Sequence, residues 1–99
     1  MPEHRTLSDL NETPHAELFD RHQPRTVRLE LAAGEGVPAH NHPGTDIVLH
    51  LLSGRLTVSL DEECYELDAG ELLQFSGDRE IEPRAEEDST AVIVFAPAT

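Results

Sequence analysis

The chain contains no lysine and a single cysteine among its 99 residues. Without lysine there is no amine for a Schiff base, and no phosphate-binding loop of the Gly-x-x-x-x-Gly-Lys type can form. The lone Cys64 excludes an internal disulfide and a cysteine-rich metal site. No serine stands in a nucleophile elbow either. These absences exclude several common classes of enzyme.

Long apolar runs and targeting signals are also lacking. No apolar segment approaches the roughly 20 residues that a membrane helix needs. The first residues, Met1 to Arg5, do not show the basic and then apolar pattern of a signal peptide. Cys64 lies in a short strand-like segment, where we expect it to be a small buried hydrophobe in a reducing compartment. The sequence therefore predicts a soluble cytoplasmic protein.

Basic residues are few and acidic residues are many. Seven arginines stand against 20 Asp and Glu, which gives a net charge of −13. Such a surface repels phosphate backbones and anionic lipids, so neither nucleic acid nor membrane is expected as a partner. Because the acids are spread along the chain, we interpret them as a halophilic adaptation, in which salt screens the repulsion. The acidic segment 80–88 is predicted to be a solvated face and loop.

Alternation of apolar and polar residues predicts an all-β domain. Val27, Leu29 and Leu31 alternate with charged residues, as in a strand with one buried face. Further strand-like segments follow at short spacing, separated by turn signals and without helical periodicity. An antiparallel barrel or jelly roll of about eight strands is the expected closure, because it removes most exposed strand edges. These further segments are 47–52, 56–60, 65–67, 72–75 and 91–95.

The polar residues 1–24 are predicted to form an N-terminal arm, and residues 25–99 to form the single barrel domain. Thr6-Leu7-Ser8-Asp9 has the spacing of a capping box, which predicts one helical turn. His15 and His22 also lie in the arm, and we expect neither to have a functional role.

The segment 47–52 is apolar on both faces except at His50. Its outer face needs a cover, which either the arm or a second subunit could supply. A homodimer is the simpler expectation.

Two histidines form the centre of the segment 34–54. His40 and His42 are two residues apart, and on an extended backbone such side chains point to the same face. A loop sequence, 34–39, precedes them, and the apolar strand 47–52 follows them. The loop should therefore bring two imidazole nitrogen donors to the barrel.

This segment resembles the first motif of the small single-domain cupins, the RmlC-like family. That motif is Gly, five residues, His-x-His, three or four residues, Glu, six residues, Gly. Here Gly34 is followed by five residues, His40-Asn41-His42, three residues and Asp46, and seven residues then separate Asp46 from Gly54. The resemblance implies an antiparallel double-stranded β-helix, the cupin jelly-roll barrel.

The position of the family's glutamate is ambiguous in this chain. Counting forward from His42 places it at Asp46, whereas counting back from Gly54 places it at Ile47. A β-bulge between Asp46 and Gly54 would reconcile the two counts. Only Asp46 has an oxygen to offer, so it is the candidate ligand; the alternative is a turn residue that hydrogen-bonds its own backbone.

The second motif of the family is Gly, five residues, Pro-x-Gly, two residues, His. It starts here at Gly70 and places Ile81, which cannot bind a metal, where the family has its third histidine. By analogy with polar residues in the lumen of other cupins, Gln74 could point into the same space.

The resemblance implies a divalent metal ion, Fe, Mn, Ni or Zn, held by His40, His42, Asp46 and Gln74. Two imidazoles and a carboxylate leave open coordination positions for oxygen or substrate. The implied activity is that of a metal-dependent dioxygenase or isomerase of a small metabolite. The alternative is a non-catalytic cupin that binds a small ligand, or a structural dimeric barrel, in which the histidines are remnants of a lost metal site.

Overall fold

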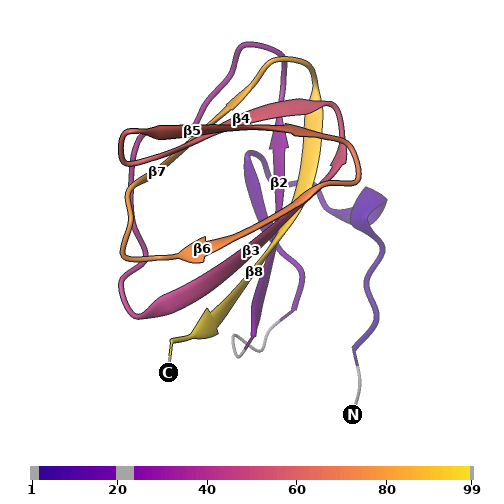
Figure 1. The fold of residues 1–99 in the computed structure, drawn as a ribbon. Coiled ribbons are helices and arrows are strands. Elements are labelled where there is room, and N and C mark those ends of the chain that lie inside the picture. Colours follow the sequence, from indigo (N-terminus) through magenta and orange to yellow (C-terminus); the bar gives the residue numbers. More distant parts are fainter. Residues whose placement is uncertain (1–2, 20–23, 99) are drawn as a thin grey trace.

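Eight strands form two antiparallel sheets in a computed structural model that describes residues 3–19 and 24–98. The five-stranded sheet has the order β1-β2-β8-β3-β6, and the three-stranded sheet has the order β5-β4-β7. Figure 1 shows the two sheets curving around a common interior. The predicted all-β jelly-roll architecture is confirmed. The bounds are β1 His15–Glu17, β2 Arg25–Leu31, β3 Thr45–Ser53, β4 Arg55–Leu60, β5 Glu63–Asp68, β6 Leu72–Ser76, β7 Ile81–Ala85 and β8 Ser89–Pro97.

The core lies between the sheets and is built from the inward-facing residue of each alternating pair. Every strand from β2 to β8 contributes to it, and its largest fully buried side chains are leucine, isoleucine and valine. Burying each such side chain contributes about 1.5–3 kcal/mol. The eight largest are Val27, Leu29, Ile47, Leu49, Leu51, Leu56, Val58 and Leu60.

Two expectations from the sequence need correction. The acids of the segment 80–88 are exposed as predicted, but the segment also contains a strand, β7, whose Ile81, Pro83 and Ala85 are buried while the residues between them are exposed. Proline is tolerated because β7 is an edge strand of its sheet and Pro83 faces the loop, from which its carbonyl accepts the Val37 N–H, so the ladder with β4 loses no donor. Cys64 is exposed, because the alternation of β5 turns Leu67 inward and Cys64 outward.

The expected β-bulge is present in β3. Pairing with β8 runs without interruption from Thr45 to Leu51, and the register then shifts before Ser53. The turn that follows contains Gly54 with a φ of +88°, a conformation that glycine adopts without strain. The extra residue is therefore absorbed at the end of β3 that lies far from Asp46.

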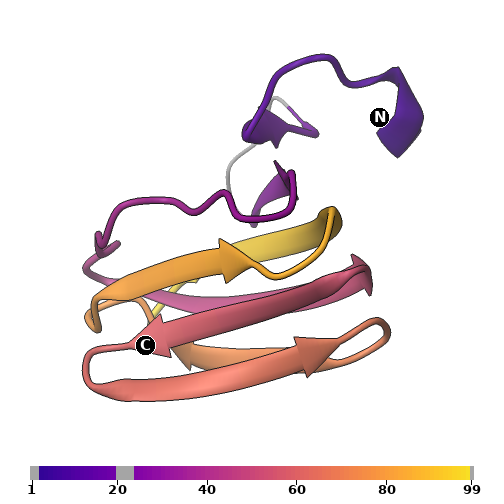
Figure 2. The same cartoon turned by 90° about the horizontal axis from the view of Figure 1, so that it is seen from above.

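The N-terminal arm starts with a short 3-10 helix, η1 (Leu7–Asp9), close to the helical turn that the sequence predicts. The Thr6 side chain makes no capping hydrogen bond. After η1 the arm joins the barrel, because β1 pairs with β2 at the edge of the larger sheet. Figure 2 shows the arm lying beside the stacked strands.

A buried arginine, Arg28, fixes the arm to the outer face of the larger sheet. Only 5% of Arg28 is exposed. Its guanidinium donates hydrogen bonds to the carbonyls of Leu7, Leu10 and Glu12 at 2.8–3.2 Å, and its charge is paired with Glu30 at 3.3 Å. Hydrogen bonds from a charged donor are among the stronger ones in proteins. Arg28 therefore holds the arm through main-chain carbonyls and not through the arm's side chains.

No helix in the described part of the chain is long and apolar enough to cross a membrane.

Candidate functional site

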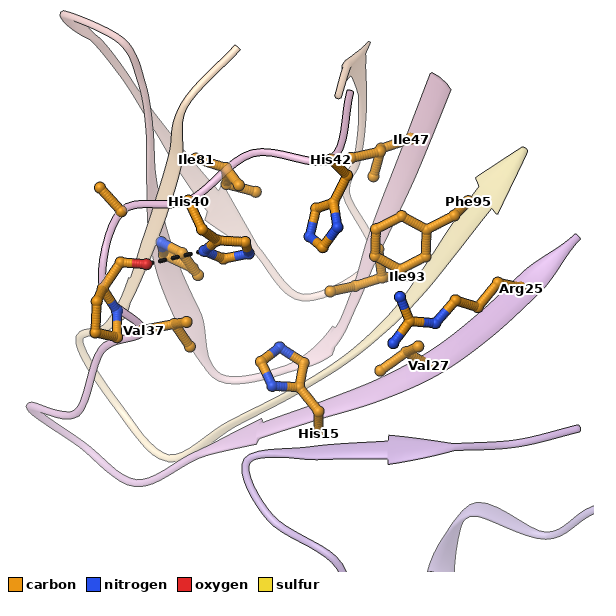
Figure 3. Close-up of a pocket in the computed structure, with 13 residues that line it drawn as sticks. His15, Arg25, Val27, Val37, His40, His42, Ile47, Ile81, Ile93 and Phe95 are labelled. Atoms are coloured by element: carbon orange, nitrogen blue, oxygen red, sulfur yellow. Dashed lines mark hydrogen bonds between the residues drawn. The ribbon is translucent and has the colours of Figure 1, made fainter. Parts of the chain in front are cut away.

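A cavity of about 410 Å³ lies between the loop that joins β2 to β3 and the inner faces of the strands. Its walls come from both sheets, from the loop and from the arm, so residues far apart in the sequence meet there. Figure 3 shows imidazole rings entering it from two sides. The lining residues are His15, Arg25, Val27, Val37, Pro38, Ala39, His40, His42, Ile47, Ile81, Pro83, Ile93 and Phe95.

His40 is held by its backbone and by its ring. A β-bridge pairs it with Ile81 of β7. Its Nδ1 lies 2.8 Å from the carbonyl oxygen of Pro38, which can only accept, so Nδ1 carries the hydrogen. In the neutral ring Nε2 then keeps its lone pair. This is the arrangement that orients metal-binding histidines, whose other ring nitrogen usually donates to a carbonyl or carboxylate.

His42 is held at the end of the same loop. Its N–H donates to the carbonyl of Gly77 at 2.7 Å, and its own carbonyl accepts from the Thr45 hydroxyl at 2.7 Å. A Cβ on Gly77 would overlap the Thr45 hydroxyl and the His42 carbonyl, so only glycine fits there. The His42 ring lies edge-on to Phe95 at 4.8 Å and to His40 at 4.9 Å between centroids. The structure thus brings the two predicted histidines together.

Asp46 and Gln74 do not join the histidines, so the expectation that they share the lumen is wrong. Both are exposed on the outer face of the larger sheet, while their neighbours Ile47 and Phe75 are buried and face inward. Strand alternation causes this, because the bulge lies beyond Leu51 and leaves the register at Asp46 unshifted. Ile47 therefore takes the inward position at which the resembling family has its glutamate.

The donor set within the cavity is two imidazoles flanked by isoleucines. Among residues 3–19 and 24–98, no group of three or more His, Cys, Asp or Glu side chains could hold a metal ion. His40 and His42 fit a divalent metal as two ligands, one fewer than the usual catalytic zinc site provides. Such a metal would be weakly held and would keep several positions for water or a ligand.

The arm brings a third imidazole to the rim of the cavity. His15 lines the cavity, and Glu17, two residues further along β1, lies on the same side of the strand. Glu17 accepts hydrogen bonds from Nε and Nη2 of Arg25 at 2.9 and 2.6 Å. The Arg25 guanidinium lies 5.1 Å from the centre of the Phe95 ring, a cation–π distance.

Burial and neighbouring basic groups lower the pKa values of His42 and His15. Burial lowers the pKa of the His42 ring, and the charges of His40, Arg25 and His15 lower it further. Burial also lowers the pKa of His15, where His40 and Arg25 act in the same direction and Glu17 opposes them. Neutral imidazoles near pH 7 keep the lone pairs that ligation or proton acceptance requires.

Sequence reasoning missed His15 and Arg25. His15 has no local signal, since its place depends on the pairing of β1 with β2, in which it stands opposite Leu29. Arg25 begins a strand whose alternation the sequence did show from residue 26. His22 lies outside the described residues.

Comparisons with known proteins agree with this architecture. A family model of the Cupin domain matches residues 27–97. The structure of KdgF from Halomonas sp. superposes with a TM-score of 0.85 at 16% identity, covering 100% of this chain and 96% of that one. A cupin protein from Bacteroides fragilis gives a TM-score of 0.79 at 27% identity, covering 99% and 87%.

An RmlC-like cupin from Desulfovibrio desulfuricans gives a TM-score of 0.79 at 18% identity, covering 98% of this chain and 97% of that one. No curated protein matches the chain. At these identities the solved structures establish the fold, and the family model establishes the membership. With a matching domain over most of its length and the jelly-roll architecture to go with it, the chain belongs to the cupin family.

Proposed function

We propose that this cupin binds a small metabolite in its cavity and holds an exchangeable divalent metal there through His40 and His42. The observation that carries the proposal is the pair of adjacent imidazoles, one with Nδ1 committed to Pro38 and Nε2 left with its lone pair. Both face a cavity that is otherwise mostly apolar. A few polar groups in an apolar pocket are the usual composition of a ligand site.

A bound divalent metal would supply Lewis-acid or oxygen-activating chemistry, as in a dioxygenase or an isomerase of a small cytoplasmic metabolite. The chain itself contributes position and environment. The Gly77 and Thr45 hydrogen bonds fix His42, and the Ile81 bridge fixes His40. Ile93 and Phe95 exclude water from one wall, which strengthens electrostatic interactions inside.

The experiment is metal analysis of protein purified without chelator, followed by titration of the metal-free form with Zn²⁺, Mn²⁺, Ni²⁺ and Fe²⁺. His42→Ala is expected to abolish binding, and His40→Ala to weaken it by at least about tenfold. The matched control is His50→Ala, because His50 lies on β3, the strand that follows the histidine loop, with its side chain on the outer face. Binding that is equally lost in the control, or absent with all four metals, would contradict the metal proposal.

A second candidate is a non-catalytic cupin that binds its ligand without metal. Ile47 and Ile81 favour it, because they fill with hydrocarbon the two remaining positions at which the family pattern has ligands. Under this reading the metal titration is negative, while a small ligand still raises the melting temperature.

A further inference from the structure

The wall of the cavity has the opposite charge character to the rest of the chain. The protein has 20 acidic residues and a net charge of −13. Among the described residues, however, no Asp or Glu lines the cavity, and its charged or titratable groups are one guanidinium and three imidazoles. Glu17 at the rim offsets part of the charge of Arg25, and the pKa values of His15 and His42 are lowered, so the wall acts mainly through its N–H donors. Donors without a facing carboxylate favour a ligand that carries anionic acceptor atoms.

Arg25 is the fixed positive charge of this wall. Glu17 accepts from Nε and Nη2, at one edge of the guanidinium, and no described residue accepts from Nη1. The guanidinium lies beside the Phe95 ring, and Figure 3 shows it pointing toward the space between the His15 and His42 rings. Arginine presents a planar set of donors that matches a carboxylate better than a point charge does.

His15 faces the same space from the neighbouring strand. It lies on β1, which pairs with β2, the strand that carries Arg25, and both side chains line the cavity. Figure 3 places the His15 ring below His40 and His42, on the side toward Val27. An imidazole N–H at this rim can donate to one oxygen of an anion while Arg25 donates to the other.

The remainder of the wall is hydrocarbon. Val27, Ile93 and Phe95 from the larger sheet face Ile81 from the smaller one, and Val37 covers them from the loop. Apolar carbon buried against such a surface contributes about 25 cal/mol per Å². An inorganic anion would leave this surface unused, whereas a carboxylate with a short carbon chain would cover it.

We propose that the cavity binds a small organic carboxylate, with its carboxylate group on Arg25 and His15 and its carbon chain on the apolar wall. This proposal rests on the proposed function, which assigns the cavity as the ligand site. It does not require a bound metal. The carboxylate end would lie at the rim formed by the arm, and the carbon chain would lie toward His40 and His42.

The test compares three probes by NMR titration of the full chain in a buffer that contains EDTA. Hexanoate has both the carboxylate and the chain, hexanamide has the chain without the charge, and acetate has the charge with almost no chain. Hexanoate is expected to bind about tenfold more tightly than either of the others, because only it uses both parts of the wall. Equal affinity for hexanoate and hexanamide would overturn the proposal.

Variants locate the charge. Arg25→Gln should lower the affinity for hexanoate to that for hexanamide. The double variant Arg25→Gln with Glu17→Gln should do the same while also removing the negative charge of Glu17 from the rim. Arg84→Gln, on an exposed position of β7, is the matched control and should bind as the parent does. If hexanoate keeps its preference in both Arg25 variants, the proposal fails.

The two proposals fail in different ways. Loss of metal binding in the titration above leaves the EDTA experiment unaffected. Hexanoate binding that appears only after Mn²⁺ is added, and that survives Arg25→Gln, would place the carboxylate on the metal and overturn the role of Arg25 while supporting the metal site.

Discussion

His40 and Ile81 are joined through both of their backbone amides, with the His40 N–H 3.1 Å from the Ile81 oxygen and the Ile81 N–H 2.7 Å from the His40 oxygen. This pair holds the histidine loop against β7. Both side chains line the cavity, so Ile81 is a neighbour of the imidazoles. Only 5% of Ile81 is exposed. The position at which cupin motifs carry their third histidine is thus already directed into the site.

We predict that Ile81→His creates a metal site with three imidazoles. Without metal, a polar group in this apolar wall should destabilise the fold by about 1–3 kcal/mol. Added Zn²⁺ should raise the melting temperature of the variant more than that of the parent, because metal binding only to the folded state stabilises it. Differential scanning calorimetry with and without Zn²⁺ measures both effects.

Two controls belong to this prediction. Ile81→Phe introduces a ring without a lone pair and should show no response to Zn²⁺. Asp46→Asn removes a carboxylate on the outer face and should leave metal binding unchanged. A variant Ile81→His that stays less stable than the parent at every Zn²⁺ concentration would remove the metal-binding reading of the cavity.

Salt concentration should control stability. Because the chain carries a net charge of −13 and no lysine, lowering KCl from about 2 M to about 0.05 M lengthens the screening distance and should lower the melting temperature. Replacing the exposed acids Glu62, Glu66 and Glu82 by glutamine should flatten this dependence. A melting temperature that does not change over this range would contradict the halophilic interpretation.

A homodimer should form through the outer face of the larger sheet. This face carries half-exposed valines on β3 and β8 and an exposed leucine on β6, which a second copy would remove from water. Light scattering in high salt should give the mass of a dimer, and a charge at the centre of the face, as in Val94→Asp, should give a monomer. These apolar residues are Val48, Leu72, Val92 and Val94, the leucine being 60% exposed, and they share the face with Asp46, His50 and Gln74.

The control for assembly is Ser59→Asp, on the outer face of the smaller sheet, which should remain dimeric. A parent protein that is monomeric at micromolar concentration would contradict the dimer.

Acid should remove the stabilising contribution of Arg79. Hydrogen bonds from Arg79 lower the pKa values of Asp61 and Glu63. A carboxyl group whose pKa is lower in the folded state stabilises the fold above its unfolded pKa, about 4, and loses that effect as pH falls through the folded value. Arg79→Met should therefore be less stable than the parent near neutral pH, and the difference should shrink between about pH 5 and 2. Urea unfolding at each pH measures it, and a constant difference would count against the assignment.

Most of the barrel could be predicted from the sequence, because inward and outward positions differ sharply in polarity. The strands β1, which lies in the predicted arm, and β7 are exceptions. β7 alternates correctly at Ile81, Pro83 and Ala85, but its proline and the charged residues in and around it are typical of a loop. Only the pairing of β7 with β4 reveals it as a strand.

The site was predictable in part. The spacing of His40 and His42 sufficed, since both rings line the cavity. Asp46 was misplaced because a bulge could be inferred but not located; its position after Leu51 decides which side chain faces inward. His15 and Arg25 reach the cavity through long-range pairing, which no local pattern encodes.

The hydrogen bonds from Arg28 to the arm leave the arm's side chains free to vary in sequence. All three acceptors are main-chain carbonyls, so the guanidinium recognises the course of the arm and not its side chains. Substitutions along residues 7–12 can accumulate without releasing the arm, and the rim residues His15 and Glu17 can then change while the barrel stays constant. If the cavity binds the proposed carboxylate, its ligand preference could be altered through the arm without repacking the core.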